Sequence, residues 1–215
     1  MTLTRLRSIP IAAGLLLGSL SALADMPSVK SVDAPPVASS PRLMRTAVLT
    51  DVRTALARGD SIGKLYSGAA CETTADREWS DLTLRRVQTD LSVAFRDEIA
   101  RTRGPLLAAD HGATPLRVQA VLDNIDVQVC QAAAGAWRGG FYVQVDWQIV
   151  SPDSGKVVYQ TSTEGSFMLN EPQRTPTAEG LREAFGVAVR NLIADRGFAA
   201  MLEPAERHRV AQLAY

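Results

Sequence analysis

The stretch FYVQVDWQIVSPDSGKVVYQTSTEGSF, residues 141–167, constrains the fold of this chain more than any other part of its sequence. Alternate positions in its first half are apolar and share one face of a predicted strand, namely Phe141, Val143, Val145, Trp147 and Ile149. The segment SPDSGK then predicts a turn, because Gly155 adopts positive φ without steric cost. The stretch therefore predicts a β-hairpin with one buried face, which a second layer must cover.

Two segments have the spacing of amphipathic helices and supply such a layer. The first spans residues 81–103 and ends at Gly104, and the second spans residues 176–196 and ends at Gly197. Apolar residues recur at three- and four-residue steps in both: Leu84, Val87, Leu91, Ala94, Phe95 and Ile99 in the first, and Leu181, Phe185, Ala188 and Leu192 in the second. Each helix is expected to lie with this stripe on the sheet.

Three further strands are expected before the hairpin. Residues 46–52 (TAVLTDV) and 61–71 (SIGKLYSGAAC) read as short strands, and residues 116–130 alternate until the apolar phase shifts at Asp123-Asn124. A β-bulge produces such a shift. The predicted fold class is α+β: a two-layer sandwich in which a mostly antiparallel sheet of about five strands carries two long helices on one face.

The N-terminus predicts secretion. Residues 1–24 contain Arg5 and Arg7, then an apolar run and a small-x-small end, which together are typical of a cleavable signal peptide. We expect a disordered, proline-rich leader over residues 25–45, one α+β domain over 46–202 and a polar tail over 203–215.

Charge argues against one class of partner. The chain has 23 basic and 23 acidic residues, and removal of residues 1–24 takes away Arg5 and Arg7 and no acid, which leaves 21 against 23. This balance gives no basic field that would attract nucleic acid.

The location expected from the signal peptide is the bacterial periplasm.

The two cysteines, Cys71 and Cys130, lie at the ends of predicted strands in a chain expected in an oxidising compartment. We expect them to form a disulfide, which would stabilise the fold by roughly 4 kcal/mol in the chain-entropy model. Two buried thiols are the alternative. A redox or metal role is disfavoured, because thioredoxin-like motifs place the cysteines two residues apart.

The segments YSGAAC, YVQVDWQIVSPDSGKVVYQTSTEGSF and LREAFGVAVRNLIAD resemble periplasmic α/β accessory domains of Gram-negative bacteria, across roughly residues 46–202. The nearest are the auxiliary lipoproteins of lipid-transporting ABC systems, and a similar uncharacterised module accompanies trypsin-like proteases. The resemblance implies an accessory role in the envelope. Those lipoproteins attach through a cysteine that follows the signal, whereas Asp25-Met26 stands at that place here.

Sequence motifs for catalysis are weak. GDSIG, residues 59–63, matches G-x-S-x-G, but a nucleophile elbow needs a strand before Ser61 and a helix after it, and here the predicted order is reversed. The histidines, His111 and His208, lie in a predicted loop and tail, and a single histidine seldom builds a metal site.

Paired acids and phosphate sites are weak candidates too. Asp123 and Asp126 lie on the expected wet side of the sheet, where sharing of one proton is disfavoured. The segment AAAGAWRGG lacks the lysine and following helix of a phosphate loop. We expect no catalytic residues, no metal and no cofactor.

Two surfaces are candidates for contact with a partner. Trp137 and Arg138, within the loop 132–140, are residue types that often dominate interfaces, although the favoured role of Trp137 is to fold back and cover the end of the core. An unpaired edge at residues 46–52 or 157–163 would accept a partner strand.

The expected function is therefore non-enzymatic binding of another envelope protein, whose identity the sequence does not specify, as it does not specify the oligomeric state. The alternatives are a transport auxiliary that contacts lipid or the membrane surface, and an envelope hydrolase that uses Ser61.

Overall fold

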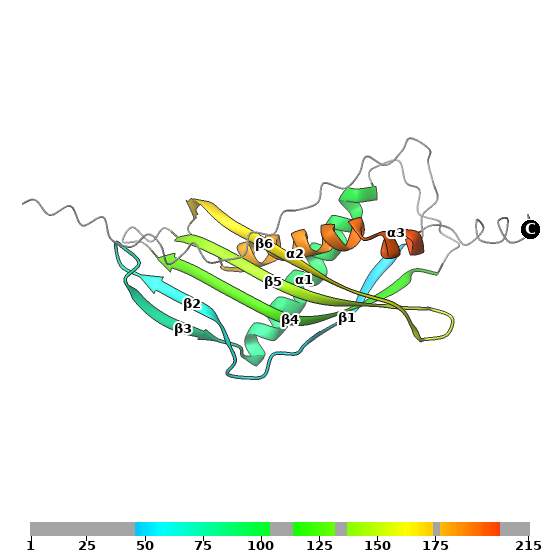
Figure 1. The fold of residues 1–215 in the computed structure, drawn as a ribbon, viewed down its shortest axis with the longest axis horizontal. Coiled ribbons are helices and arrows are strands. Elements are labelled where there is room, and N and C mark those ends of the chain that lie inside the picture. Colours follow the sequence, from blue (N-terminus) through cyan, green and yellow to red (C-terminus); the bar gives the residue numbers. More distant parts are fainter. Residues whose placement is uncertain (1–45, 104–113, 132–136, 174–176, 203–215) are drawn as a thin grey trace, which may run out of the picture.

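The structure is a computed structural model that describes residues 46–103, 114–131, 137–173 and 177–202 (Figure 1). The predicted signal peptide, leader and tail lie outside these residues. The elements run in the order β1 (Ala47–Thr54), β2 (Ser61–Ser67), β3 (Thr73–Glu78), α1 (Asp81–Arg103), β4 (Leu116–Gln131), β5 (Trp137–Val150), β6 (Val157–Gln173), α2 (Thr177–Ala194) and α3 (Arg196–Leu202). None of the helices within these ranges is both long and apolar enough to cross a membrane.

The described strands form one mixed sheet of six strands, not a mostly antiparallel sheet of about five. Its order is β3-β2-β4-β5-β6, with β1 also paired to β4. The first half of β4 pairs in parallel with β1, and its second half pairs in parallel with β2. Both pairings are parallel because the chain passes through the crossover helix α1 before it returns as β4.

The prediction missed β3, which pairs antiparallel with β2. Its sequence, TTADRE, has a single apolar residue, Ala75, so it lacks the alternation that indicates a half-buried strand. It forms because the edge of β2 is available for pairing. There Leu65 pairs with Ala75, and Tyr66 pairs with Thr74.

The three long strands agree with the sequence-based expectation. β4, β5 and β6 are antiparallel neighbours, and Ser151 donates its backbone N–H to the Lys156 carbonyl across the predicted hairpin turn. The register of β4 against β5 shifts between Leu122 and Asn124, so the predicted bulge is confirmed at Asp123.

The helices α1 and α2 cover one face of the sheet, as expected from their apolar stripes (Figure 1). The second helix ends at Ala194, however, and a short third helix follows it. Gly197 was expected to end α2 but lies inside α3, because the Asp195 carboxylate accepts the Phe198 backbone N–H and so caps the start of the new helix. A Cβ at Gly197 would lie 2.4 Å from the Tyr159 ring, so the glycine is required for close packing.

A buried carboxylate joins the two long helices. Glu98 of α1 is 4% exposed, and its Oε1 accepts from Arg190 of α2 at 2.5 Å and from Arg101 at 2.6 Å. Gly186 faces this carboxylate and leaves room for it, since a Cβ there would lie 3.0 Å from the same oxygen. The pair fixes how α1 and α2 lie side by side, because a buried charge needs its partner.

Side chains at the centre of the core link α1, β5, β6 and α2. The rings of Phe95 on α1 and Trp147 on β5 lie 6.0 Å apart. Trp147 Nε1 donates to Thr163 Oγ1 on β6 at 2.7 Å, and Thr163 Oγ1 donates to the Ala188 carbonyl on α2 at 2.8 Å. Both hydrogen bonds lie within the apolar core, so the buried indole N–H is satisfied.

The backbone of α2 lies directly against β6 at Gly165. A Cβ there would lie 2.0 Å from the Ala184 carbonyl oxygen and 2.6 Å from the Ala188 backbone nitrogen. Gly165→Ala is therefore expected to lower the free energy of unfolding by about 2 to 3 kcal/mol, because a main-chain contact cannot move aside. Urea-induced unfolding measures the change. Ser162→Ala, at an exposed position of the same strand, is the matched control, and equal stability of the two variants would contradict the packing.

A hydrogen bond to a charged group ties β6 to α3. Tyr159 Oη donates to Asp195 Oδ1 at 2.6 Å. Burial alone would raise the pKa of Asp195, but the hydrogen bonds from Tyr159, from the backbone amides of Phe198 and Gly197 and from Thr161 together bring it below the ordinary 3.8. The ionised carboxylate therefore stabilises the fold above the ordinary pKa, and this stabilisation is lost as the pH falls through the lowered value.

Tyr159→Phe is expected to cost about 1 to 2 kcal/mol of unfolding free energy at neutral pH, because it removes a hydrogen bond to a charged acceptor. The difference from the unsubstituted protein should shrink strongly at an acidic pH below the lowered pKa of Asp195, where the carboxylate is protonated. Tyr66→Phe is the control, since Tyr66 Oη donates to the neutral Gln128 Oε1. A Tyr159→Phe difference that is the same at both pH values would rule out the charged bond.

Candidate functional site

Ser61 opens a strand and is not placed as a nucleophile. It is the exposed first residue of β2 and pairs with Glu78 of β3. The preceding residues 55–60 form a turn after β1, although TALAR looks helical in the sequence. A nucleophile elbow has a helix after the serine, and here a strand follows. His111 and His208 lie outside the described residues, so the structure does not test them as partners of Ser61.

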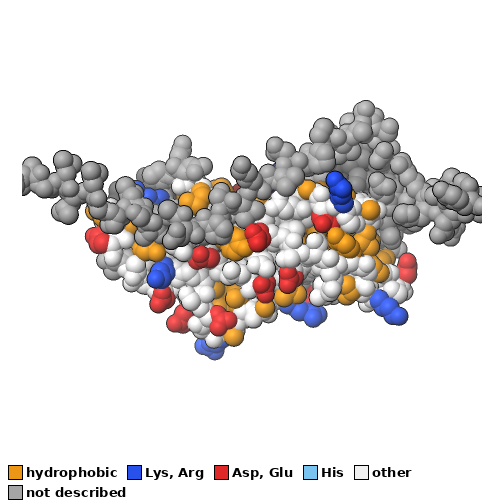
Figure 2. Space-filling view, viewed as in Figure 1, with side chains coloured by type: hydrophobic (Ala, Val, Ile, Leu, Met, Phe, Trp, Pro, Cys, Tyr) orange, Lys and Arg blue, Asp and Glu red, His pale blue; other side chains and the backbone are white. Residues whose placement is uncertain are grey.

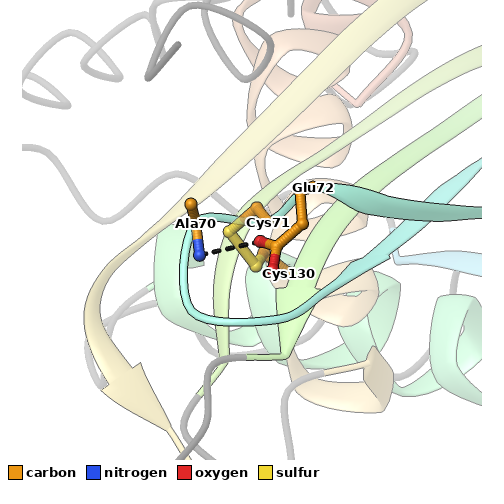
Figure 3. The surroundings of a disulfide bond; sticks show 4 residues. All are labelled: Ala70, Cys71, Glu72 and Cys130. Carbon is orange, nitrogen blue, oxygen red and sulfur yellow. Dashed lines mark hydrogen bonds between the residues drawn. A yellow bond between two sulfur atoms is a disulfide. The ribbon is translucent and has the colours of Figure 1, made fainter. Parts of the chain in front are cut away.

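The cysteines predicted to pair do form a disulfide, Cys71–Cys130, across 59 residues of sequence (Figure 3). Cys130 is fully buried on β4, and Cys71 lies in the connection between β2 and β3, where its φ is 58°. Next to it, the Glu72 carboxylate accepts the Ala70 backbone N–H at 2.9 Å. The bond therefore anchors the β2–β3 connection to the end of β4.

Trp137 and Arg138 were expected in a loop over residues 132–140, but they begin β5, where they pair with β4; residues 132–136 lie outside the described residues. Trp137 is partly buried and packs against the core, which is the position expected of a cover residue. Arg138 is exposed and pairs with Cys130 across the β4–β5 ladder. The structure does not test whether either residue binds a partner.

Asp123 and Asp126 lie on the face of the sheet away from the helices, as expected. Asp123 is the bulged residue, and the Asp126 carboxylate accepts from Gln128 Nε2 at 3.1 Å. Close by, burial, then the charge of Glu164 and a hydrogen bond to it, then the charge of Asp123 raise the pKa of Tyr142 to about 12. The Tyr142 hydroxyl therefore stays protonated at neutral pH and donates to a carboxylate.

This open face presents ordered polar rows across three strands. The registers align Gln119 with Gln148 and Gln160, Val121 with Asp146 and Ser162, Asn124 with Gln144 and Glu164, and Asp126 with Tyr142 and Ser166. Figure 2 shows acidic side chains spread over the face of the molecule that it presents. Three of these four rows carry a carboxylate, from Asp146, Glu164 or Asp126, and residues 144–148 and 160–164 contain no basic residue.

Exposed apolar side chains gather at the margins of the sheet. The large apolar residues exposed within the described ranges are Val48 (47%), Val157 (45%), Val158 (49%) and Met168 (41%). The first lies on β1 and the others on β6, and each of these strands has a described neighbour on one side only. Edge strands more often carry charge at such positions, which deters pairing with another chain.

The outer edge of β6 is closed at one point by α2. Asn191 Nδ2 donates to the Glu164 carbonyl oxygen at 2.9 Å, so this carbonyl points away from β5. Residues of an antiparallel strand alternate between bonding the neighbour and pointing outward. Because the register is unbroken from Tyr159 to Leu169, Gln160 and Ser162 also direct their N–H and C=O groups outward.

The edge at β1 is closed in the same manner. Gln88 Nε2 of α1 donates to the Val52 carbonyl oxygen at 2.9 Å. Each long helix thus caps one carbonyl of one edge strand. Sequence reasoning missed both caps, because Gln88 and Asn191 lie 36 and 27 residues from their acceptors and no local pattern links them.

A shallow groove with a volume of about 570 Å³ runs along the outer side of α1. Its lining consists of Arg85, Gln88, Thr89, Ser92, Val93 and Arg96. All of these belong to one helix, so this groove does not lie between the helices and the sheet. We take the β6 edge as the candidate functional site because three of the four large apolar residues exposed within the described ranges lie on β6.

Comparisons with known proteins assign neither a family nor a function. No protein-family model and no curated protein matches the chain. Solved structures with some likeness include a DUF330 protein from Xanthomonas campestris (13% identity, TM-score 0.31, 81% of this chain and 92% of that chain). A candidate lipoprotein from Caulobacter crescentus has 15% identity and a TM-score of 0.33 over 70% and 89% of the two chains. PelC from Paraburkholderia phytofirmans, a dodecamer, has 12% identity and a TM-score of 0.29 over 70% and 93%.

The outward geometry of β6 predicts a pattern of amide hydrogen exchange. The Gln160 and Ser162 amides should exchange on the order of 100-fold faster than those of Thr161 and Thr163, which face β5 in the ladder. Residue-resolved exchange measured by NMR on the isolated protein checks this. Equal protection of all four amides would mean that something covers the edge.

Proposed function

We propose that this chain is an accessory protein of the bacterial cell envelope that binds another protein and carries out no reaction itself. The observation that supports the proposal best is the placement of its exposed apolar residues. Val157 and Val158 lie beside the outward backbone groups of β6, at an edge that a chain with no partner would be expected to protect.

The expected compartment agrees with two features. Residues 1–24 have the composition of a signal peptide, and the Cys71–Cys130 disulfide suits an oxidising environment such as the periplasm.

Site-specific photocrosslinking in intact cells tests the binding role. A photoreactive amino acid at Val158 should capture a discrete protein, because the position is exposed beside the β6 edge. The matched control is the same amino acid at Arg96, an exposed position on the outer side of α1. Capture of no protein at either position would refute the proposal, and so would capture of the same proteins at both.

The absence of enzymatic activity has a separate test. Purified protein should not react with a fluorophosphonate probe, since Ser61 starts a strand. Labelling that disappears in Ser61→Ala would establish a serine hydrolase in place of a binding protein.

A further inference from the structure

We propose that residues 157–163 of β6 form a strand-addition site that receives an extended segment of the partner protein, with a β-branched apolar residue and a basic residue in that segment. This inference rests on the proposed function and specifies its surface and the chemistry of its partner. The site is a backbone edge, and hydrogen bonds to main-chain groups supply the affinity in this mode of recognition.

The outward groups of Gln160 and Ser162 define the centre of the site. Both residues occupy non-bonded positions of the β5–β6 ladder, where N–H and C=O point away from β5, toward the side on which β6 has no neighbour among the described strands. The next outward carbonyl, that of Glu164, is occupied by Asn191 Nδ2. An incoming strand can therefore form hydrogen bonds with the edge as far as Ser162. It must diverge from β6 at Glu164, because the carbonyl of this residue is already bonded.

The hairpin end of the site is apolar. Val157 and Val158 are 45% and 49% exposed, and the register shift between Ile149 and Val150 places an extra residue of β6 at this point. A β-branched or other apolar side chain of the incoming strand would cover the two valines. Cross-strand pairs of this kind stabilise a sheet by about 0.2 to 1 kcal/mol each.

The other end of the site is acidic. Asp146 pairs with Ser162, and Glu164 lies two residues further along β6 on the same open face. The neighbouring segments 144–148 and 160–164 supply no basic side chain to balance these carboxylates. A lysine or arginine of the partner, opposite Ser162, would meet the opposite charge of Asp146 and Glu164, whereas an acidic residue would be repelled.

A selection from random peptides of about ten residues, displayed on phage and presented to the full chain, tests the proposal. Enriched peptides should contain β-branched and basic residues, and the synthetic winner should slow exchange of the Gln160 and Ser162 amides. A version of this peptide with N-methyl groups at alternate amides keeps its side chains but loses donors. It should bind at least about tenfold more weakly.

A matched pair of variants separates the backbone from the side chain. Ser162→Pro removes an outward N–H without removing a bond to β5, and edge strands tolerate proline, so the fold should survive while binding weakens at least about tenfold. Ser162→Ala keeps the N–H and should bind within about threefold of the unsubstituted protein. Asn191→Ala frees the Glu164 carbonyl and should bind the same peptide several-fold more tightly.

Several results would overturn the inference: a selection without enriched peptides, a winner that binds Ser162→Pro with unchanged affinity, or protection of amides elsewhere in the sheet. Self-association of the chain through the same edge, seen by sedimentation and abolished by Ser162→Pro, would assign the edge to a second copy and would also overturn it. Capture at Val158 in cells that persists in Ser162→Pro would leave the proposed function standing and refute the strand-addition site alone. Absence of specific capture at Val158 in the protein without the proline substitution would refute the proposed function.

Discussion

The hydrogen bonds from Trp147 through Thr163 to Ala188 hold the layers of this protein in one arrangement. An indole N–H in an apolar core must find an acceptor, and a threonine hydroxyl can accept it while donating to a helix carbonyl. One side chain of β6 thereby sets the position of α2 over the sheet. Gly165, two residues further on, then allows the helix backbone to approach so closely that no other residue fits.

The position of α2 has a direct effect on the edge of the sheet. Because the helix lies close to β6, Asn191 reaches the Glu164 carbonyl and shortens the stretch that is open to pairing. Gln88 of α1 does the same at Val52 of β1. The packing of the core thus determines which edge groups the helices reach, and the candidate site is the part of the β6 edge before the carbonyl that α2 caps.

Local patterns in the sequence predicted the parts of the fold that local interactions determine. The hairpin, the α1 stripe and the bulge at Asp123 could all be inferred from apolar spacing, and the disulfide from the two cysteines and the expected compartment. The parallel pairing of β1 and β2 with β4 could not, because it joins residues more than 60 positions apart. β3 was missed because its sequence has no apolar alternation. Gly197 was wrongly predicted to end the helical region, because the Asp195 side chain caps a new helix that begins just before it.

The candidate site was predictable only in outline. Residues 157–163 stood out as a strand whose edge was a candidate for pairing, but the same was true of residues 46–52. The alternation of outward groups at Gln160 and Ser162 depends on the register with β5, and the closure at Glu164 depends on a helix that follows in the chain. Distant contacts of this kind leave no pattern in a single sequence.

β1 and β2 pair with different halves of the same side of β4, and this division determines which part of the sheet the disulfide holds. β1 ends where the Ala55 amide bonds to the Leu122 carbonyl, and the pairing with β2 begins only at Val127. The disulfide fastens the β2–β3 half alone. A reductant would consequently remove the covalent link between the β2–β3 connection and β4, and would leave the parallel β2–β4 pairing and the buried side chains of Ile62 and Tyr66 to hold this half of the sheet.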